Sequence, residues 1–306
     1  MKRYLAYRLL LLVPVVWGVS TLVFLLIHLI PGDPIEVMLG ETALPADKAA
    51  LRGELHLDLP LHVQYLAFLQ GLARGDLGRS LFAPRPVWDA IRAGLPATAE
   101  LAVAALAIAL LIAVPLGTLA AMKRNTWADR GAMLLALLGV SVPNFVLAPL
   151  LVLAFSIALG VLPVSGREGF GSLVLPAATL GAGMAGILSR MVRSSLLEVL
   201  RQDFITVALA KGLPRWRVVL KHALRTALIP VLTLVGLQLG GLLSGAIITE
   251  TIFAWPGLGR LAFQAIQSRD YPLVQGCVLV IALTYVAVNL ATDLLYALAD
   301  PRVRYR

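Results

Sequence analysis

The side chains that most often carry chemistry in proteins are sparse and scattered in this sequence. Its four histidines lie far apart, and none has the spacing of a metal-binding motif such as HExxH. A single cysteine, Cys277, excludes a disulfide within the chain and a site built from several thiolates. No spacing suggests a Ser–His–Asp arrangement or a catalytic pair of carboxylates. We therefore expect no catalytic residue and no metal site.

One glycine pattern has the spacing of a dinucleotide site. Residues 181–186 read GAGMAG, which matches GxGxxG, and Asp203 follows about 20 residues later. Such a site needs a preceding strand and a soluble βαβ unit, whereas this segment lies in an uncharged apolar run. Glycines there let helices approach closely, and we predict this packing role. The pattern GxxxxGKS/T is absent, so we expect no ATP-binding loop in this chain.

The composition indicates a membrane protein. Of 306 residues, 59% are hydrophobic and 14% are charged, whereas a typical soluble domain carries about 25% charged residues. The mean hydropathy is +0.87. These values argue against a soluble enzyme and exclude disorder. A net charge of +9 could suggest a nucleic-acid partner. In a membrane protein, however, the distribution of charge along the chain matters more than the total, so we expect no nucleic-acid partner.

Six uncharged apolar runs are long enough to cross a membrane, which takes about 20 residues. They cover residues 9–30, 101–122, 131–166, 169–189, 226–249 and 271–292. Each must be helical, because lipid offers no hydrogen-bond partners to exposed backbone. The first run lacks a small-x-small cleavage site, so we expect a retained span rather than a signal peptide.

The basic residues predict the orientation. Segments 2–8, 123–130, 190–225 and 300–306 together hold seventeen Lys and Arg but only four acids. By the positive-inside rule these segments and both termini are cytoplasmic. Residues 131–189 must then cross the membrane twice, so run 131–166 is one span with an irregular extension. The expected division is a transmembrane helix over 1–30, an extracytoplasmic region over 31–96, a transmembrane core over 97–300 and a tail over 301–306.

Within the core, residues 194–225 form the largest cytoplasmic loop. Asp203–Ala210 should form a short helix with an acidic start, which suits the helix dipole. Lys211 and Gly212 would end it, since glycine adopts the left-handed conformation readily. A second short, basic amphipathic helix would follow Pro214 and cover 215–225. Residue chemistry leaves two roles open: a projecting surface that a cytoplasmic partner binds, or a segment held to anionic lipid.

The fifth span carries polar side chains and closely spaced glycines. The polar residues are Thr233, Gln238, Ser244 and Thr249, and the glycines are Gly236, Gly240, Gly241 and Gly245. The polar side chains would either line a pathway or form interhelical hydrogen bonds. The glycines would allow close packing, within the chain or with a partner subunit.

The loop resembles the EAA loop of bacterial ABC-importer permeases in the peptide/nickel branch. The matching loop residues are Ala208, Ala210, Lys211, Gly212, Leu213, the run KHALR at 221–225 and Pro230. Ordered matches extend along the chain: HLIPGDP at 28–34, LDLPL at 57–61, GDLG at 75–78, LPAT at 95–98, SVPNF at 141–145, IFAWPGLGR at 252–260, RDYP at 269–272 and DPR at 300–302. The positions that give the loop its name hold Thr206, Val207 and Ala208 instead, and Thr206 and Leu209 stand where many relatives have Arg.

This resemblance implies an all-α integral membrane protein with six transmembrane helices and the type I ABC importer permease fold, located in the bacterial inner membrane. Its implied partners are a homologous second permease subunit, two ATP-binding subunits that hold ATP and Mg, an extracytoplasmic solute-binding protein and membrane lipid. The ATPase-coupling residues would be Thr206, Val207, Ala208, Ala210, Lys211, Gly212, Leu213 and Arg215.

The cargo stays open between several classes. Di- and oligopeptides come first, and nickel chelates or glutathione are the alternatives within the same fold. An ATP-independent secondary carrier is an alternative of another class. Carriers of that class use charged groups inside the membrane, and the six runs contain no Asp, Glu, Lys or Arg.

Overall fold

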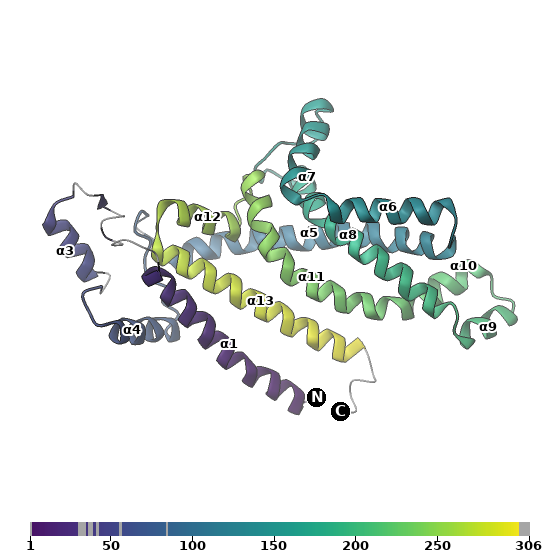
Figure 1. Cartoon of the computed structure of the whole chain (residues 1–306), viewed down its shortest axis with the longest axis horizontal. Helices are drawn as coiled ribbons and strands as arrows, with labels where there is room; N and C mark the ends of the chain where they lie inside the picture. The colour runs from purple at the N-terminus through teal and green to yellow at the C-terminus, as the bar shows by residue number, and fades with distance from the viewer. Residues whose placement is uncertain are drawn as a thin grey trace. The chain divides into compact units, whose positions relative to one another are not determined.

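The computed structural model describes residues 2–29, 35, 39–40, 43–54, 57–83 and 85–299. Across these ranges the regular structure is helical, with one isolated β-bridge between Arg79 and Pro86, so the expected all-α class is confirmed. Figure 1 labels the elements, in which η marks a π-helix: α1 (Lys2–Leu29), α3 (Pro45–Glu54), α4 (Leu61–Ala73), α5 (Val87–Met122), α6 (Trp127–Ser141), α7 (Asn144–Leu151), η1 (Val152–Ala158), α8 (Phe170–Val199), α9 (Asp203–Ala210), α10 (Arg215–Arg217), η2 (Val218–Ala223), α11 (Leu224–Ile252), α12 (Leu258–Ser268) and α13 (Tyr271–Ala299).

Four of the described helical stretches are long and apolar enough to cross a membrane: Val87–Met122, Phe170–Val199, Arg215–Leu242 and Tyr271–Thr292. The pair Trp127–Ser141 and Asn144–Ala158 passes the same test together, although the two are bent by 105°. In α1, the apolar stretch Leu10–Leu25 is shorter. The chain is therefore a multi-pass membrane protein, and the count of six spans stays a prediction.

The long apolar run at 131–166 is broken where its first proline lies. Pro143 precedes α7, and α6 ends at Ser141. A residue before proline is pushed out of the helical region, and Val142 is extended at ψ 116°. The extension, expected to be irregular, is instead helical through α7 and η1 (Figure 1). Pro149 lies inside α7 without ending it.

The backbone contacts divide the chain into two compact units. Unit 1 comprises residues 1–96 and 257–286. Its core packs the start of α5 with α12 and the start of α13, through Val87, Ile91, Leu258, Ala262 and Cys277. Asp270 is buried where α12 meets α13, and it accepts a hydrogen bond from the hydroxyl of Ser80.

Unit 2 comprises residues 97–256 and 287–306, and α8 packs against α6, α7 and α11 within it. The glycines of the GxGxxG match make this packing close. A Cβ on Gly181 would lie 2.8 Å from the carbonyl oxygen of Ala105 in α5, and one on Gly186 would overlap that of Ala136 in α6. Gly236 of α11 similarly leaves no room for a Cβ beside Thr292 of α13. The predicted packing role of these three glycines is thereby confirmed.

The helix α5 begins at Val87, inside the predicted external region, and continues through Pro96 into the apolar run 101–122. One helix boundary differs from expectation. Residues 215–225 do not form a separate short helix, because α10, η2 and α11 follow one another without a break. No glycine lies between Arg215 and Thr226 to end the helix there, and Pro230 is accommodated inside α11.

Candidate functional site

The short helix α9 combines one buried side chain with three exposed apolar ones. Its bounds, Asp203–Ala210, are those expected from the sequence. Ile205 is buried, at 4% exposure, whereas Phe204, Val207 and Leu209 are exposed by 41 to 53%. One side chain therefore fixes the helix to the unit, and three large apolar side chains stay available to another molecule.

The turn after α9 reverses the chain as glycine permits. Gly212 has φ +79°, the left-handed region that residues with a Cβ adopt at a cost. Its N–H donates to the carbonyl oxygen of Leu209 at 2.9 Å. Pro214 then starts the next helical stretch at φ −64°. The backbone of this turn follows the signals read from its sequence.

A cluster of buried apolar residues, here called the loop cluster, lies beneath α9. It joins the ends of α5 and α8 to α9, η2 and α11, and consists of Ala121, Leu196, Val199, Ile205, Val218, Val219, Ala223 and Ala227. Ala208 and Leu213 pack against it and are half-buried. Of the other expected coupling residues, Thr206, Val207, Ala210, Lys211, Gly212 and Arg215 are exposed. The expected set thus contains two positioning residues and six that face outward.

An ion pair that sequence reasoning missed holds α6 to α8 near this cluster. The Nε of Arg193 donates to Oδ1 of Asp129 at 2.6 Å, and a second guanidinium nitrogen donates to Oδ2 at 2.7 Å. The backbone N–H of Asn125 also donates to Asp129, at 2.9 Å. Asp129 is 4% exposed. The partners are sixty-four residues apart in the sequence, so no local spacing of residues indicates that they pair.

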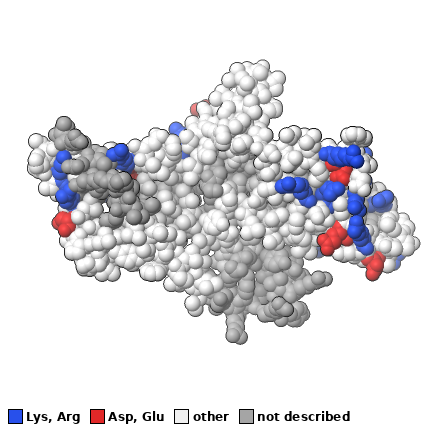
Figure 2. Space-filling view, in the orientation of Figure 1, with Lys and Arg blue, Asp and Glu red and all other residues white. Residues whose placement is uncertain are grey.

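Basic side chains gather at the same end of unit 2. Figure 2 shows Lys and Arg concentrated over the ends of α6 and α8 and over α9 and α10. The exposed basic residues of these segments are Lys123, Arg124, Arg130, Arg190, Arg201, Lys211, Arg215, Arg217, Lys221 and Arg225. This end therefore carries a positive surface beside the exposed apolar residues of α9.

The expected pathway residues do not share one face of α11. Thr233 and Gln238 are five positions apart, which places them roughly 140° apart around a helix. Both are half-buried, and Thr249 is fully buried. The side chain of Ser244 lies outside the described residues. Gln238 and Thr249 are eleven positions apart, which places them within roughly 20° of each other around the helix. These two therefore share one side of α11.

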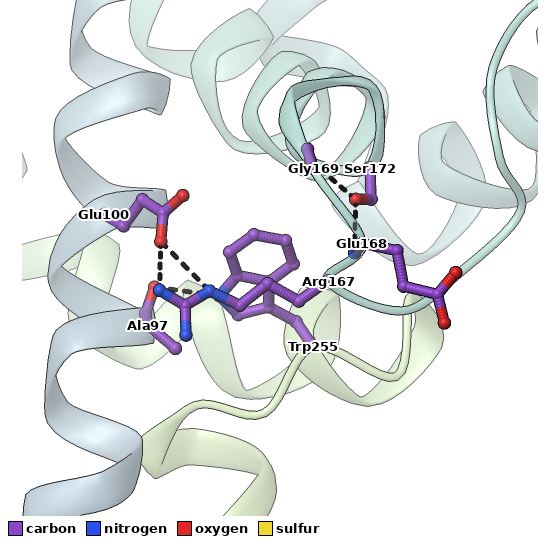
Figure 3. Close-up of polar contacts among 7 residues, drawn as sticks. All are labelled: Ala97, Glu100, Arg167, Glu168, Gly169, Ser172 and Trp255. Carbon is purple, nitrogen blue, oxygen red and sulfur yellow. Dashed lines mark hydrogen bonds and ion pairs between the residues drawn. The ribbon is translucent and has the colours of Figure 1, made fainter.

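At the opposite end of unit 2, a loop is fastened to α5 around a buried tryptophan (Figure 3). Arg167 forms an ion pair with Glu100, and its Nε lies 3.0 Å from Oε2. The Arg167 guanidinium lies 5.7 Å from the ring centroid of Trp255, which is fully buried. The indole N–H of Trp255 donates to the carbonyl oxygen of Ala97 at 2.8 Å. These contacts connect three segments that are distant in sequence.

A carboxylate lies directly after the fifth apolar run, near the end of α11. Glu250 is fully buried and accepts a 2.6 Å hydrogen bond from Thr98. The apolar run ends at residue 249, and α11 continues to Ile252 and includes this glutamate. The run itself, residues 226–249, holds no Asp, Glu, Lys or Arg. Among the described residues, no group of three or more His, Cys, Asp or Glu is placed to hold a metal ion.

Comparisons with known proteins cover the whole chain. Residues 113–305 match the family described as binding-protein-dependent transport system inner membrane component, and residues 1–102 match the N-terminal family of the same membrane components. The dipeptide transport system permease protein DppB of Alkalihalophilus pseudofirmus is 45% identical, with all of both chains covered. DppB of Escherichia coli K12 is 42% identical, and the glutathione transport system permease protein GsiC of Salmonella choleraesuis 43%, both also at full coverage.

Solved structures with a similar fold include an inward-facing conformation of the MetNI methionine ABC transporter, with a TM-score of 0.56 and 19% identity, covering 69% of this chain and 96% of that one. The likeness concerns the fold alone.

Proposed function

The chain belongs to the family of binding-protein-dependent transport system inner membrane components, and on that premise we propose that it is the permease subunit of an ABC importer for di- and oligopeptides. It is a transport component and not an enzyme, as its relatives are named permeases. The observation that carries the peptide assignment is identity of 42–45% over full length with proteins named for dipeptide transport.

The proposed ATP-binding partners account for two features of the α9 segment, namely its exposed apolar residues and the turn that follows it. Of the two ATP-binding subunits, which would hold ATP and Mg, one docks on the exposed apolar residues of α9 and on the turn at Gly212. The contacting residues would be Thr206, Val207, Ala210, Lys211, Gly212 and Arg215, with Ala208 and Leu213 as positioning residues. Support comes from Phe204, Val207 and Leu209, which are large apolar side chains exposed by 41 to 53%.

Transport would proceed by alternating access. A homologous second permease subunit completes the pathway, and an extracytoplasmic solute-binding protein delivers the cargo. ATP binding would favour the outward-open state because the ATP-binding subunits interact differently with the two states. The loop cluster supports this role, since it packs α9 against the ends of α5, α8 and α11. A displacement of α9 therefore acts on three long helices at once.

The proposed orientation places α9, the basic surface and both termini on the cytoplasmic side of the inner membrane. The concentration of basic side chains at one end of unit 2 supports it. The loop around Arg167 and Trp255 would then lie on the extracytoplasmic side. The proposed pathway residues are Thr233, Gln238, Ser244 and Thr249. Of these, Gln238 and Thr249 share one side of α11.

Uptake by the assembled transporter tests the function. Cells that lack this gene would be compared with complemented cells for ATP-dependent uptake of a labelled dipeptide, labelled glutathione, and labelled nickel with a chelator. Loss of dipeptide uptake alone supports the peptide assignment. Loss of glutathione uptake alone favours the second candidate, which rests on the similarity to GsiC. Loss of nickel uptake alone favours a chelate.

A secondary carrier is the alternative of another class. Buried Glu250 is the kind of group on which ion coupling depends. Uptake that persists without ATP hydrolysis and follows a proton gradient, and that is lost in Glu250→Gln, would establish the carrier in place of the importer.

A further inference from the structure

The turn between α5 and α6 presents a compact group of exposed basic and aromatic side chains, here called the basic turn: Lys123, Arg124, Trp127 and Arg130. Its backbone is fixed locally. The hydroxyl of Thr126 donates to the carbonyl oxygen of Lys123 at 2.6 Å, and the N–H of Asn125, which has φ +63°, donates to the carboxylate of Asp129. The four side chains therefore project from a defined scaffold.

The exposed charge of the basic turn is entirely positive. Its one acid, Asp129, is buried and occupied by both nitrogens of Arg193 and by the Asn125 N–H. Among the described residues, Lys123, Arg124 and Arg130 take part in no ion pair. Three cations thus stand together with no acid beside them at the surface, and an anionic ligand would complement them.

Trp127 indicates where that ligand lies. Its side chain is 84% exposed, and the guanidinium of Arg130 lies 5.4 Å from its ring centroid. The residue begins α6, the first arm of the bent apolar pair, just after the turn from α5, a helix suited to cross the membrane. Tryptophan is enriched at the boundary between hydrocarbon and water, where its ring sits at the level of the lipid headgroups. The same level is where lipid phosphates lie.

We propose that the basic turn binds the headgroup of an anionic phospholipid, with its phosphate held by Lys123, Arg124 and Arg130 and with Trp127 at the headgroup level. The site differs from the surface of α9, which exposes Phe204, Val207 and Leu209 and suits a protein. The proposal concerns lipid, and it depends on neither the cargo nor the ATP-binding subunits.

Quenching of Trp127 by brominated lipid tests the proposal in the assembled, reconstituted transporter. The fluorescence of Trp127 is obtained by subtracting the emission of the Trp127→Phe transporter from that of the wild type. Phosphatidylglycerol brominated near the ester end of the chain should quench it at a roughly tenfold lower mole fraction than brominated phosphatidylcholine does. The variant K123Q/R124Q/R130Q should lose this preference. The control R74Q/R79Q/R92Q, which removes three exposed arginines of unit 1, should keep it.

Equal quenching by the two lipids would overturn the proposal, and so would an unchanged preference in K123Q/R124Q/R130Q. If that variant fails to assemble, Arg124→Gln alone should reduce the preference about twofold, because three cations share the tenfold preference. Emission that neither lipid quenches in the complex, but that both quench in the permease alone, would mean that a protein subunit covers the turn. That result also contradicts a lipid site.

Discussion

The indole N–H of Trp255 donates its hydrogen bond to the carbonyl oxygen of Ala97, which lies 158 residues earlier in the chain. Both groups are buried, so the bond closes the end of unit 2 with a polar contact away from water. Above the ring, Arg167 pairs with Glu100 and completes the connection between α5 and the loop before α8.

Replacing Trp255 with Phe should destabilise unit 2 by about 1–3 kcal/mol, because the Ala97 carbonyl would lose its donor while staying buried. Thermal unfolding of the purified protein in detergent measures this. The matched control is Trp127→Phe, at a side chain that is 84% exposed, which should leave the unfolding temperature nearly unchanged. Equal effects of the two substitutions would contradict the role given to Trp255.

Asp129→Asn should lower the free energy of unfolding by about 2–3 kcal/mol, since two charge-assisted hydrogen bonds to Arg193 are weakened at a buried site. Chemical denaturation in micelles provides the measurement. Glu100→Gln removes a second, more exposed ion pair of unit 2, whose partners are 40% and 41% exposed, and should change stability by about 0–1 kcal/mol. The expectation fails if the two changes prove similar.

Gly212→Val should abolish ATP-dependent uptake while the protein stays in the membrane at its normal level. A β-branched residue at φ +79° is strained by about 1–3 kcal/mol and would shift the turn that presents Lys211 and Arg215. Uptake at matched abundance is the measurement. Gly131→Val is the control, because Gly131 is helical and has open space around its Cβ position. Normal uptake by the Gly212 variant would remove the turn from the coupling surface.

Val207→Ser should weaken association with the ATP-binding subunits roughly tenfold without loss of folding, since Val207 is 53% exposed and its burial by a partner contributes about 1–2 kcal/mol. Ile205→Ser, at a side chain that is 4% exposed, should reduce folding stability instead. Co-purification with the ATP-binding subunits and thermal unfolding separate the two effects. A folded Val207 variant that binds as tightly as the wild type would contradict docking on this face.

The parts of the site that were predictable are those set by neighbouring residues. The start of α9 at Asp203 and the reversal at Gly212 follow from local signals, namely an acidic first turn and a glycine after the helix. Composition was enough to predict the all-α membrane fold class, because a backbone in lipid must form its hydrogen bonds internally.

The remaining features depend on tertiary contacts. Asp129 meets Arg193, and Arg167 meets Glu100, across 64 and 67 residues, and no spacing in one sequence encodes such pairs. Likewise, the continuation of α10 through η2 into α11 reflects packing of Val218, Val219 and Ala223 in the loop cluster. That packing overrides the expectation of a second short helix.

The glycine contacts of α8 have a consequence for any random mutagenesis of this gene. At Gly181 and Gly186 a side chain would collide with the backbone of α5 or α6, so substitutions there should be recovered as missing protein, degraded before it reaches a transporter. Substitutions on the exposed face of α9 should be recovered as abundant protein that does not transport. A screen that records protein abundance beside uptake would therefore distinguish the residues that build the subunit from those that operate it.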